Sequence, residues 1–280
     1  MKKTGHVYGH GHVYGSEEKL STGPSSLEDN IVVRTEEFGD APDTYIVLGK
    51  RTRSETIRKI FAFQQEQGTP YGVQLLSEEI IANSPWLTEF SVVRDRDYDS
   101  YVYHVRAALD DFRRLGNQRR RLISFRNRFP TAKLELYEFS NKRAFAEVLD
   151  LFRSWQTHKG KTDSETERER LVLQLMHEAN EHFKLQALLL CVDGRYIGFQ
   201  AFELKTPPYA MVHFSKIAAR YVGAEETIHR KVAEIALQKG YQYLNVGEDL
   251  GQLGLRHHKQ SYCPEFMVKA YSLYPKDASD

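Results

Sequence analysis

The sequence predicts an α/β (α+β) fold made of two similar halves, each with a mixed, largely antiparallel sheet. Runs rich in Val, Ile and Tyr, which favour strands, alternate with longer segments of helical periodicity. In the C-terminal half three strand-like runs follow one another directly, and a shorter, weaker version of the same order of elements precedes it. The length of 280 residues is enough for two ordinary domains, and a composition of 41% hydrophobic and 28% charged residues is that of a globular protein.

The first stretch, residues 1–29, is expected to be a disordered tail because Gly, Ser, Lys, Glu and Pro dominate it. The motif GHVYG occurs twice in this stretch, and neutral imidazoles such as those of His6, His10 and His12 are good metal ligands. These histidines are too few and too loosely spaced to define a site. We therefore predict no metal site.

An N-terminal domain is predicted over residues 30–130. In its last helix Leu122, Phe125 and Phe129 recur at positions i, i+3 and i+7, so one helix face is buried. The expected elements are, in order, strands at 29–38 and 43–50, helices at 53–68 and 73–84, strands at 88–95 and 99–105, and helices at 105–116 and 117–129.

A C-terminal domain is predicted over residues 131–280, and in it Asp193-Gly194 predicts a tight turn between two strands. Helices, an antiparallel meander, then helix, strand and closing strand form the order of an N-acetyltransferase-like (GNAT-like) domain. We therefore predict tandem GNAT-like domains, the first degenerate and the second catalytic. The expected elements here are a strand at 133–139, helices at 141–160 and 165–183, strands at 185–193, 195–204 and 209–217, a helix at 224–240, a strand at 241–247, a helix at 253–260 and a strand at 266–274.

Membrane-spanning and secreted proteins are disfavoured by the composition. No apolar run approaches the roughly 20 residues that cross a bilayer, and the N-terminus has no apolar stretch like that of a secretory signal. The two cysteines, Cys191 and Cys263, fit no disulfide or metal pattern. We expect a soluble, cytoplasmic protein without a transmembrane segment, and leave peripheral membrane contact and the oligomeric state open.

Positive charge is concentrated in one segment, although the net charge of the whole chain is only +1. Such a patch in a near-neutral protein indicates a localised anionic partner. Arginines bind phosphates without reading sequence and stack on exposed bases at an RNA end, so RNA fits this segment; a solvated basic face with no partner is the alternative. The segment has no acid and contains Arg113, Arg114, Arg119, Arg120, Arg121, Arg126 and Arg128.

Residues 243–271 carry the densest set of chemically competent side chains. Asn245 and Asp249 lie where a core strand exits into a loop, a common site position in α/β folds. Acyl transfer requires an acceptor that loses a proton and an oxyanion that is stabilised. A polar loop followed by a solvated basic helix is the competing interpretation. Our catalytic candidates are Asp249, Arg256, Lys259, Ser261 and Tyr262, and our substrate-binding candidates in this stretch are Asn245, Glu248 and His258.

The pattern N-x-x-x-D-L-G-x-x-G-L-R-x-x-K-x-S-Y-x-P in this stretch resembles the C-terminal signature of the catalytic domain of phosphatidylglycerol lysyltransferases. Upstream segments resemble other parts of that domain, so the resemblance covers roughly residues 100–273. These segments are LGNQRRRLISFRNRFP, FRSWQTHK, VDGRYIGFQAF and HFSKIAARYVGAEETIHRKVAE. The residues that match the signature are Asn245, Asp249, Leu250, Gly251, Gly254, Leu255, Arg256, Lys259, Ser261, Tyr262 and Pro264.

The resemblance implies a tandem acetyltransferase-like fold that takes an aminoacyl group from a charged tRNA. An alcohol or amine attacks the aminoacyl ester, and in membrane members of the family that acceptor is a phosphatidylglycerol hydroxyl. It also implies a substrate-binding lysine, here Lys216. The chain departs from the family at Val246-Gly247, where Arg-Glu is usual, and at Ser215, where an acid is common. The resemblance therefore does not extend to the choice of lysine or of a lipid.

Three hypotheses follow. The leading one is an aminoacyltransferase that moves an aminoacyl group from aminoacyl-tRNA to a hydroxyl or amine of a lipid or small metabolite, with no cofactor. The first alternative is an acyl-CoA-dependent N-acyltransferase. The turn at 222–226 is a poor site for the coenzyme A pyrophosphate, because it has one glycine and two carboxylates at a helix N-terminus. The second alternative is a non-catalytic RNA-binding module.

Overall fold

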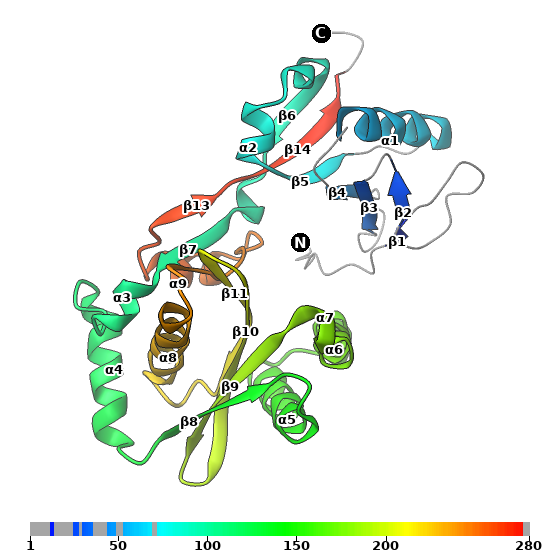
Figure 1. The fold of residues 1–280 in the computed structure, drawn as a ribbon. Coiled ribbons are helices and arrows are strands. Elements are labelled where there is room, and N and C mark those ends of the chain that lie inside the picture. The colour runs from blue at the N-terminus through cyan, green and yellow to red at the C-terminus, as the bar shows by residue number, and fades with distance from the viewer. Residues whose placement is uncertain are drawn as a thin grey trace. The chain divides into compact units, whose positions relative to one another are not determined.

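The computed structural model describes residues 12–13, 25–27, 30–35, 44–48, 53–68 and 72–276. The chain forms two compact units. Unit 1 comprises residues 1–100, 248–253 and 268–280, and unit 2 comprises residues 101–247 and 254–267. Within the described residues each unit is built on one seven-stranded sheet (Figure 1).

Unit 1 has the strand order β1-β3-β4-β5-β14-β6, with β2 on the other side of β3. The helix α1 and the sheet bury an apolar core that includes Ile57, Phe61, Leu76 and Leu273. The elements are β1 His12–Val13, β2 Ser25–Leu27, β3 Asn30–Thr35, β4 Thr44–Leu48, α1 Arg53–Gln67, β5 Val73–Ser77, α2 Glu78–Ala82, η1 Pro85–Glu89, β6 Phe90–Arg94, η2 Arg96–Tyr98 and β14 Ala270–Pro275.

Two sequence-based expectations for unit 1 differ from the structure. The segment 73–84, predicted as one helix, is the strand β5 followed by the short helix α2. β5 pairs with both β4 and β14, and these ladders outweigh the helical propensity of the segment. The stretch predicted as a disordered tail contains the strands β1 and β2, both paired with β3. These strands can form without apolar side chains because backbone groups make the pairing. The other residues of that stretch, with the candidate ligands His6 and His10, lie outside the described residues.

Unit 2 has the strand order β13-β7-β12-β11-β10-β9-β8. The parallel pair β11–β12 joins antiparallel neighbours, as the predicted mixed sheet requires. The elements are β7 Ser100–His104, α3 Val105–Leu109, α4 Gly116–Arg128, β8 Lys133–Glu138, α5 Lys142–His158, α6 Asp163–Glu178, α7 Asn180–Phe183, β9 Leu185–Val192, β10 Arg195–Thr206, β11 Tyr209–Ile217, α8 Ala224–Gln238, β12 Tyr243–Asn245, α9 Leu253–Gln260 and β13 Phe266–Val268.

Helices cover both faces of the unit 2 sheet (Figure 1). On one face α4 and α8 enclose a core that includes Phe125, Ile228 and Leu190. On the other face α5 and α6 enclose a second core, which contains Leu189. Adjacent residues of β9 thus enter opposite cores, which explains why its sequence is a continuous apolar run rather than an alternating one.

The boundary between the units differs from the predicted one at residue 130. The strand β7 was assigned to the first half, but it pairs with β12 in the unit 2 sheet. The helix α4 also belongs to unit 2, because Leu122 and Phe125 are buried in the same core as α8. The C-terminal strand β14 returns to unit 1, between β5 and β6. Pairing between distant strands decides these assignments, and the linear order of elements does not reveal it.

Among the described residues no helix combines the length and apolarity that a membrane span requires.

The parallel pairing of β11 with β12 is short, extending from Tyr209 opposite Tyr243 to Met211 opposite Asn245. β11 continues to Ile217 beyond the end of this pairing.

Gly223 allows α4 and α8 to pack closely. It precedes α8 with φ +95°, and a Cβ there would lie 2.1 Å from the carbonyl oxygen of Arg121 in α4. Gly223→Ala should lower the free energy of unfolding by about 2–4 kcal/mol, because it combines a left-handed conformation with a clash against backbone. Gly240→Ala is the matched control, with φ +86° and no atom within 4 Å of its Cβ; it should cost about 1–2 kcal/mol. Equal losses in urea unfolding would contradict the proposed packing constraint.

Candidate functional site

Five side chains meet at the first turn of α8 in unit 2. His258 Nε2, from α9, lies 2.8 Å from Glu225 Oε1. Tyr262 donates its hydroxyl to Glu226 Oε1 at 3.1 Å, and Arg121 of α4 approaches the same oxygen at 3.7 Å. Carboxylates suit the positive end of a helix dipole. The cluster links α4, α8 and α9 through two carboxylates, each with a partner of its own.

The surroundings of this cluster shift the pKa values of several of its side chains in different directions. Burial, with the charge of Glu225, raises the pKa of Glu226, which is only 2% exposed. Burial is the largest single influence on Glu225 and opposes its ionisation, but the hydrogen bond with His258 and the positive charge of His258 and Arg121 together outweigh burial and lower the pKa of Glu225. The same hydrogen bond raises the pKa of His258. His229, buried nearby, has a pKa lowered to about 4 by desolvation and is neutral at pH 7. The cluster thus contains one partly exposed ion pair, Glu225–His258, beside a buried carboxyl group whose pKa is raised.

Lys259 is part of α9, and its ammonium group lies beside the end of β12. Its Nζ donates to the carbonyl oxygen of Val246 at 2.6 Å and lies 5.7 Å from the centre of the Tyr101 ring. The hydroxyl of Tyr103 in β7 donates to the Lys259 carbonyl at 2.8 Å, which anchors the end of α9 to the sheet. Asn245 accepts a hydrogen bond from the backbone N–H of Gly247 and so shapes the turn that presents Val246. The ammonium group is therefore held in place by the backbone of the strand end.

Ser261 fastens α9 to α4. The buried Gln118 donates from Nε2 to both the carbonyl and the hydroxyl oxygen of Ser261, each at 2.9 Å. The Ser261 hydroxyl in turn donates to the His258 carbonyl at 2.7 Å. These contacts assign Ser261 to positioning α9. Arg256 lies on the same helix and is half-buried.

Asp249 and Glu248 belong to unit 1. Asp249 is fully buried, with Oδ2 3.2 Å from Arg96 and Oδ1 accepting from the Gly251 backbone at 3.0 Å. Glu248 accepts a hydrogen bond from the Ser100 hydroxyl at 2.8 Å. Both carboxylates therefore stabilise the segment that follows β12, and Asp249 has no exposed surface with which to meet a substrate.

Lys216 lies on the α5–α6 side of the unit 2 sheet. Its ammonium group forms a 2.6 Å ion pair with Glu169 of α6 and lies 3.7 Å from the centre of the Trp155 ring. Burial lowers the pKa of Lys216, against the attraction of Glu169. This pairing between α6, α5 and β11 places Lys216 apart from the cluster at α8.

The seven predicted RNA-binding arginines divide into two kinds. Arg126 forms a two-pronged ion pair with Asp111, with both N–O distances 3.1 Å, and Arg121 approaches the buried Glu226. Within the part of the chain that the structure describes, the other five have no carboxylate partner. Of these, Arg120 bonds Asn117 and Arg128 lies over the Phe129 ring. The arginines without a carboxylate partner are Arg113, Arg114, Arg119, Arg120 and Arg128.

Of the nine predicted catalytic and substrate-binding residues, six lie in unit 2 on α9, directly after it or at the end of β12. The other three lie elsewhere. Sequence reasoning missed the pairing partners Glu225, Glu226 and Glu169. Only an acid pair at a helix start marked the first two, and nothing in the sequence marked Glu169 as a partner of a lysine in β11. Among the described residues no group of three or more His, Cys, Asp or Glu side chains could hold a metal ion. The six gathered residues are Asn245, Arg256, His258, Lys259, Ser261 and Tyr262.

Known proteins with the same architecture were compared with this chain. The family described as "Phosphatidylglycerol lysyltransferase, C-terminal" matches residues 26–274. A conserved protein of unknown function from Bacteroides thetaiotaomicron is 22% identical, with a TM-score of 0.75 over 90% of this chain and 85% of that one. L-PGS from Bacillus licheniformis is 14% identical, with a TM-score of 0.60 over 89% of this chain and 82% of that one. A tandem GNAT protein from the clavulanic acid biosynthesis pathway is 11% identical, with a TM-score of 0.50 over 89% of this chain and 80% of that one. No curated protein matches the chain.

The fold is therefore a tandem GNAT-like fold, and it places the chain among acyltransferase-like proteins. More narrowly, the chain belongs to the family of phosphatidylglycerol lysyltransferase C-terminal domains, whose match spans most of its length. The resemblance inferred from the C-terminal signature is thereby confirmed.

The Glu225–His258 pair should make stability depend on pH. The raised pKa of His258 stabilises the fold below the ordinary value of 6.5, and this contribution is lost as pH rises through the folded-state pKa. The lowered pKa of Glu225 contributes above 4.5 and is lost on acidification. His258→Gln should therefore cost about 0.5–1 kcal/mol near pH 5.5, the size of a partly exposed ion pair, and less near pH 9. Urea unfolding at the two pH values measures this difference, and the exposed neighbour His257→Gln serves as the control. A pH-independent cost would contradict the assignment.

Proposed function

We propose that this protein takes an aminoacyl group from aminoacyl-tRNA and transfers it to a hydroxyl or amine of a lipid or small-metabolite acceptor. Membership of the family supports acyl transfer. The observation that carries the choice of donor is the set of five arginines on and before α4 that have no carboxylate partner among the described residues. Phosphate contacts from such arginines give affinity for RNA of any sequence.

The N-terminus of α8 argues against acyl-CoA as the donor. A coenzyme A pyrophosphate needs free backbone N–H groups at a helix start and open space in front of them. Here Gly223 lies directly against the Arg121 carbonyl, and the first turn carries Glu225 and Glu226 with their own partners. A pyrophosphate there would meet two carboxylates and would have to displace α4. An RNA bound along the outside of α4 requires neither change.

The transfer needs few protein groups. The acceptor oxygen or nitrogen attacks the aminoacyl ester carbon and forms the new C–O or C–N bond. The ester bond to the tRNA ribose then breaks, and the acceptor's proton passes to the released ribose oxygen. Lys259, held at the strand end, is suited to stabilising the negative charge that develops on the carbonyl oxygen. His258, tied to Glu225, is suited to carrying the proton, because its side chain is 36% exposed.

The basic surface can be tested by charge reversal. The double change Arg119→Glu and Arg120→Glu spares Arg121 and Arg126, whose acid partners belong to the fold. We expect tRNA affinity to fall about tenfold or more near 0.1 M salt. The slope of log affinity against log salt should fall by roughly 1.5, because each lost phosphate contact removes about 0.7–0.9. Filter binding over a salt series measures both quantities.

The matched control is Lys142→Glu with Lys239→Glu, which makes the same change in net charge at exposed positions of α5 and at the end of α8. This variant should retain nearly all of the affinity and the full salt slope. If the α4 variant binds tRNA as the wild type does, tRNA is not bound by this surface. Acyl-CoA then becomes the leading donor.

Lys259 is the residue on which the proposed chemistry depends most. Lys259→Ala should reduce single-turnover transfer from charged tRNA by roughly 100- to 1,000-fold, the range for losing one oxyanion-stabilising donor. The affinity for the charged tRNA should change far less, because the contact strengthens only in the transition state. Lys239→Ala, which changes an exposed lysine at the end of α8, should alter neither quantity. Wild-type turnover in a folded Lys259→Ala protein would remove Lys259 from the mechanism.

A further inference from the structure

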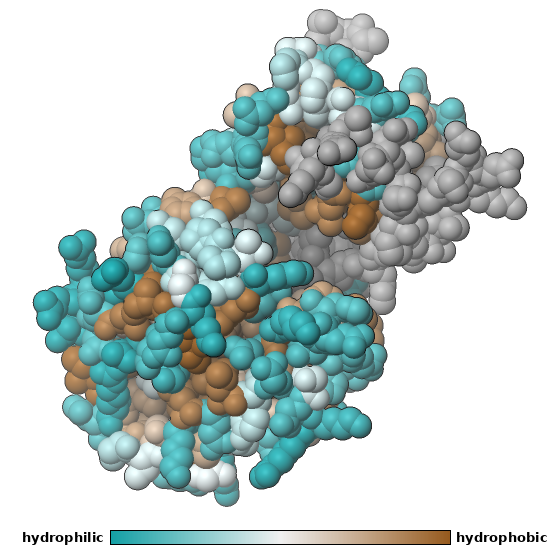
Figure 2. Space-filling model, viewed as in Figure 1, coloured by the Kyte–Doolittle hydropathy of each residue, from teal (hydrophilic) through white to brown (hydrophobic). Residues whose placement is uncertain are grey.

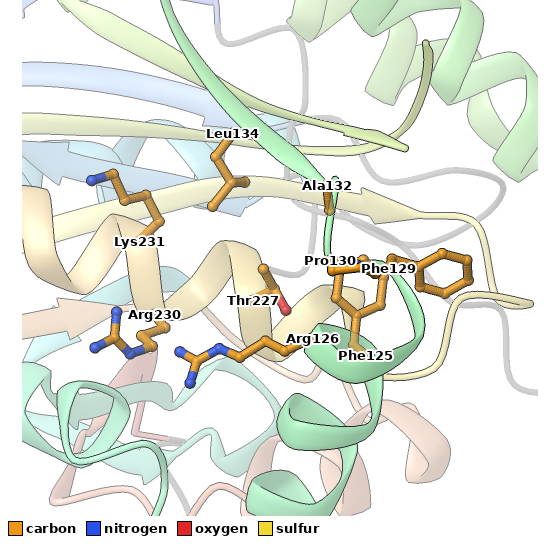
Figure 3. A pocket seen from close by; sticks show the side chains of 9 residues that line it. All are labelled: Phe125, Arg126, Phe129, Pro130, Ala132, Leu134, Thr227, Arg230 and Lys231. Atoms are coloured by element: carbon orange, nitrogen blue, oxygen red, sulfur yellow. The ribbon is translucent and has the colours of Figure 1, made fainter. Parts of the chain in front are cut away.

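Unit 2 contains a pocket of about 260 Å³ between α4, α8 and the start of β8. Figure 3 shows that Arg126 extends toward Arg230 on one side of the pocket, while Phe129 and Pro130 lie on the other. No carboxylate is among its lining residues, although three cations are. In Figure 2 apolar residues (brown) are interspersed with hydrophilic ones (teal) over this part of unit 2. The lining residues are Phe125, Arg126, Phe129, Pro130, Ala132, Leu134, Thr227, Arg230 and Lys231.

The cations are fixed from outside the pocket. Asp111 binds both terminal nitrogens of Arg126 at 3.1 Å and Arg230 Nε at 2.6 Å. The hydrogen bonds from Arg126 lower the pKa of Asp111, which keeps this carboxylate charged. Glu234 lies 3.0 Å from Lys231 Nζ. A guanidinium has five N–H donors, so these contacts orient the two arginines without using all of their donors. The donors are therefore arranged before any ligand arrives, which lowers the cost of binding an anion.

The size and lining of the pocket narrow the class of ligand. A volume of about 260 Å³ is below the roughly 300–1,000 Å³ of drug-sized sites, so the two acyl chains of a phospholipid do not fit. The apolar end is formed by Phe125, Phe129 and Pro130, and Leu134 of β8 adds an apolar wall on the side of Lys231. Flat apolar and aromatic walls beside arginines are the surroundings in which unpaired nucleobases stack. A compact ligand with one anionic group and one flat apolar part matches both ends.

We infer that this pocket binds one nucleoside monophosphate unit. The phosphate lies against Arg126, Arg230 and Lys231, and the base enters the apolar end. The source is one unpaired nucleotide of the RNA donor, an assignment that rests on the proposed function. The pocket lies at the C-terminal end of α4, the helix that carries three of the five arginines without carboxylate partners, so an RNA along that helix reaches it.

Two variants test the pocket without touching the predicted RNA-binding arginines. Lys231→Glu reverses the charge of one lining cation, and Ala132→Phe fills the apolar end. Lys142→Glu, at the exposed start of α5, is the control for net charge. The probes are free 5′-AMP, a short single-stranded RNA and a blunt RNA duplex of the same length. Binding is measured by calorimetry or fluorescence anisotropy, and thermal unfolding confirms that each variant is folded.

Wild type should bind the single strand more tightly than the duplex. Lys231→Glu should weaken single-strand binding about 10- to 100-fold, the effect of losing one charge-assisted contact, and Ala132→Phe should weaken it similarly. Binding of the duplex, and all binding by Lys142→Glu, should stay within about twofold of wild type. Wild-type affinity for the single strand in Lys231→Glu overturns the inference, even if Ala132→Phe fails to fold. Binding of 5′-AMP that the single strand does not displace overturns RNA as the source.

The test of the pocket and the test of the proposed function can succeed or fail independently. Wild-type transfer from charged tRNA, with unchanged single-strand binding in both pocket variants, leaves the function standing and removes the pocket. Absence of transfer in the wild type removes the function, while 5′-AMP binding that Lys231→Glu abolishes still supports a nucleotide pocket in unit 2.

Discussion

The close approach of α4 to the start of α8 is the constraint on which the rest of unit 2 depends. It needs a residue at 223 that has no Cβ and that adopts φ +95°, and only glycine meets both conditions without strain. With the helices this close, Leu122 and Phe125 are fully buried, and Arg121 reaches the buried Glu226. Glu226 would be costly to bury alone, and the Tyr262 hydroxyl gives it a hydrogen bond from the chain that follows α9. One backbone contact therefore positions the basic helix, the acidic turn and the candidate site relative to one another.

Much of the fold could be predicted because local signals agreed with the tertiary structure. The apolar run of β9, the Asp193-Gly194 turn and the periodicity of α4 all specify what is observed. The prediction was wrong where tertiary pairing decides. Residues 73–77 have apolar residues that also suit a helix, and only the ladders with β4 and β14 make them a strand. The compact units also divide the chain elsewhere than at residue 130, since β7 and β14 pair with strands far from them in sequence.

For the candidate site, too, contiguous residues could be predicted from the sequence and contacts between distant residues could not. The signature located α9 and its side chains, because these residues are contiguous and chemically distinctive. The residue type of Asp249 alone could not reveal its contacts. The structure shows this carboxylate buried, capping the turn at Gly251 and paired with Arg96. The spacing Asp-x-Gly was a local signal for such a turn, since Asp side chains commonly accept from the backbone two residues on. The partners Glu225 and Glu226 are more than thirty residues from His258 and Tyr262, and no local pattern reveals such pairs.

The distribution of arginine partners explains how a protein with a net charge of +1 can still present a strongly basic surface. Arg121 and Arg126 are neutralised within the fold, where their acids lie toward α8 and the segment before α4. The remaining arginines of this segment have no such acids among the described residues, so their field is not cancelled at short range. Acids elsewhere in the chain lower the net charge but act weakly here, because salt screens exposed charges beyond about 10 Å. Local pairing therefore decides which face keeps its positive charge, and the same pairing through Asp111 orients two of the cations that line the pocket.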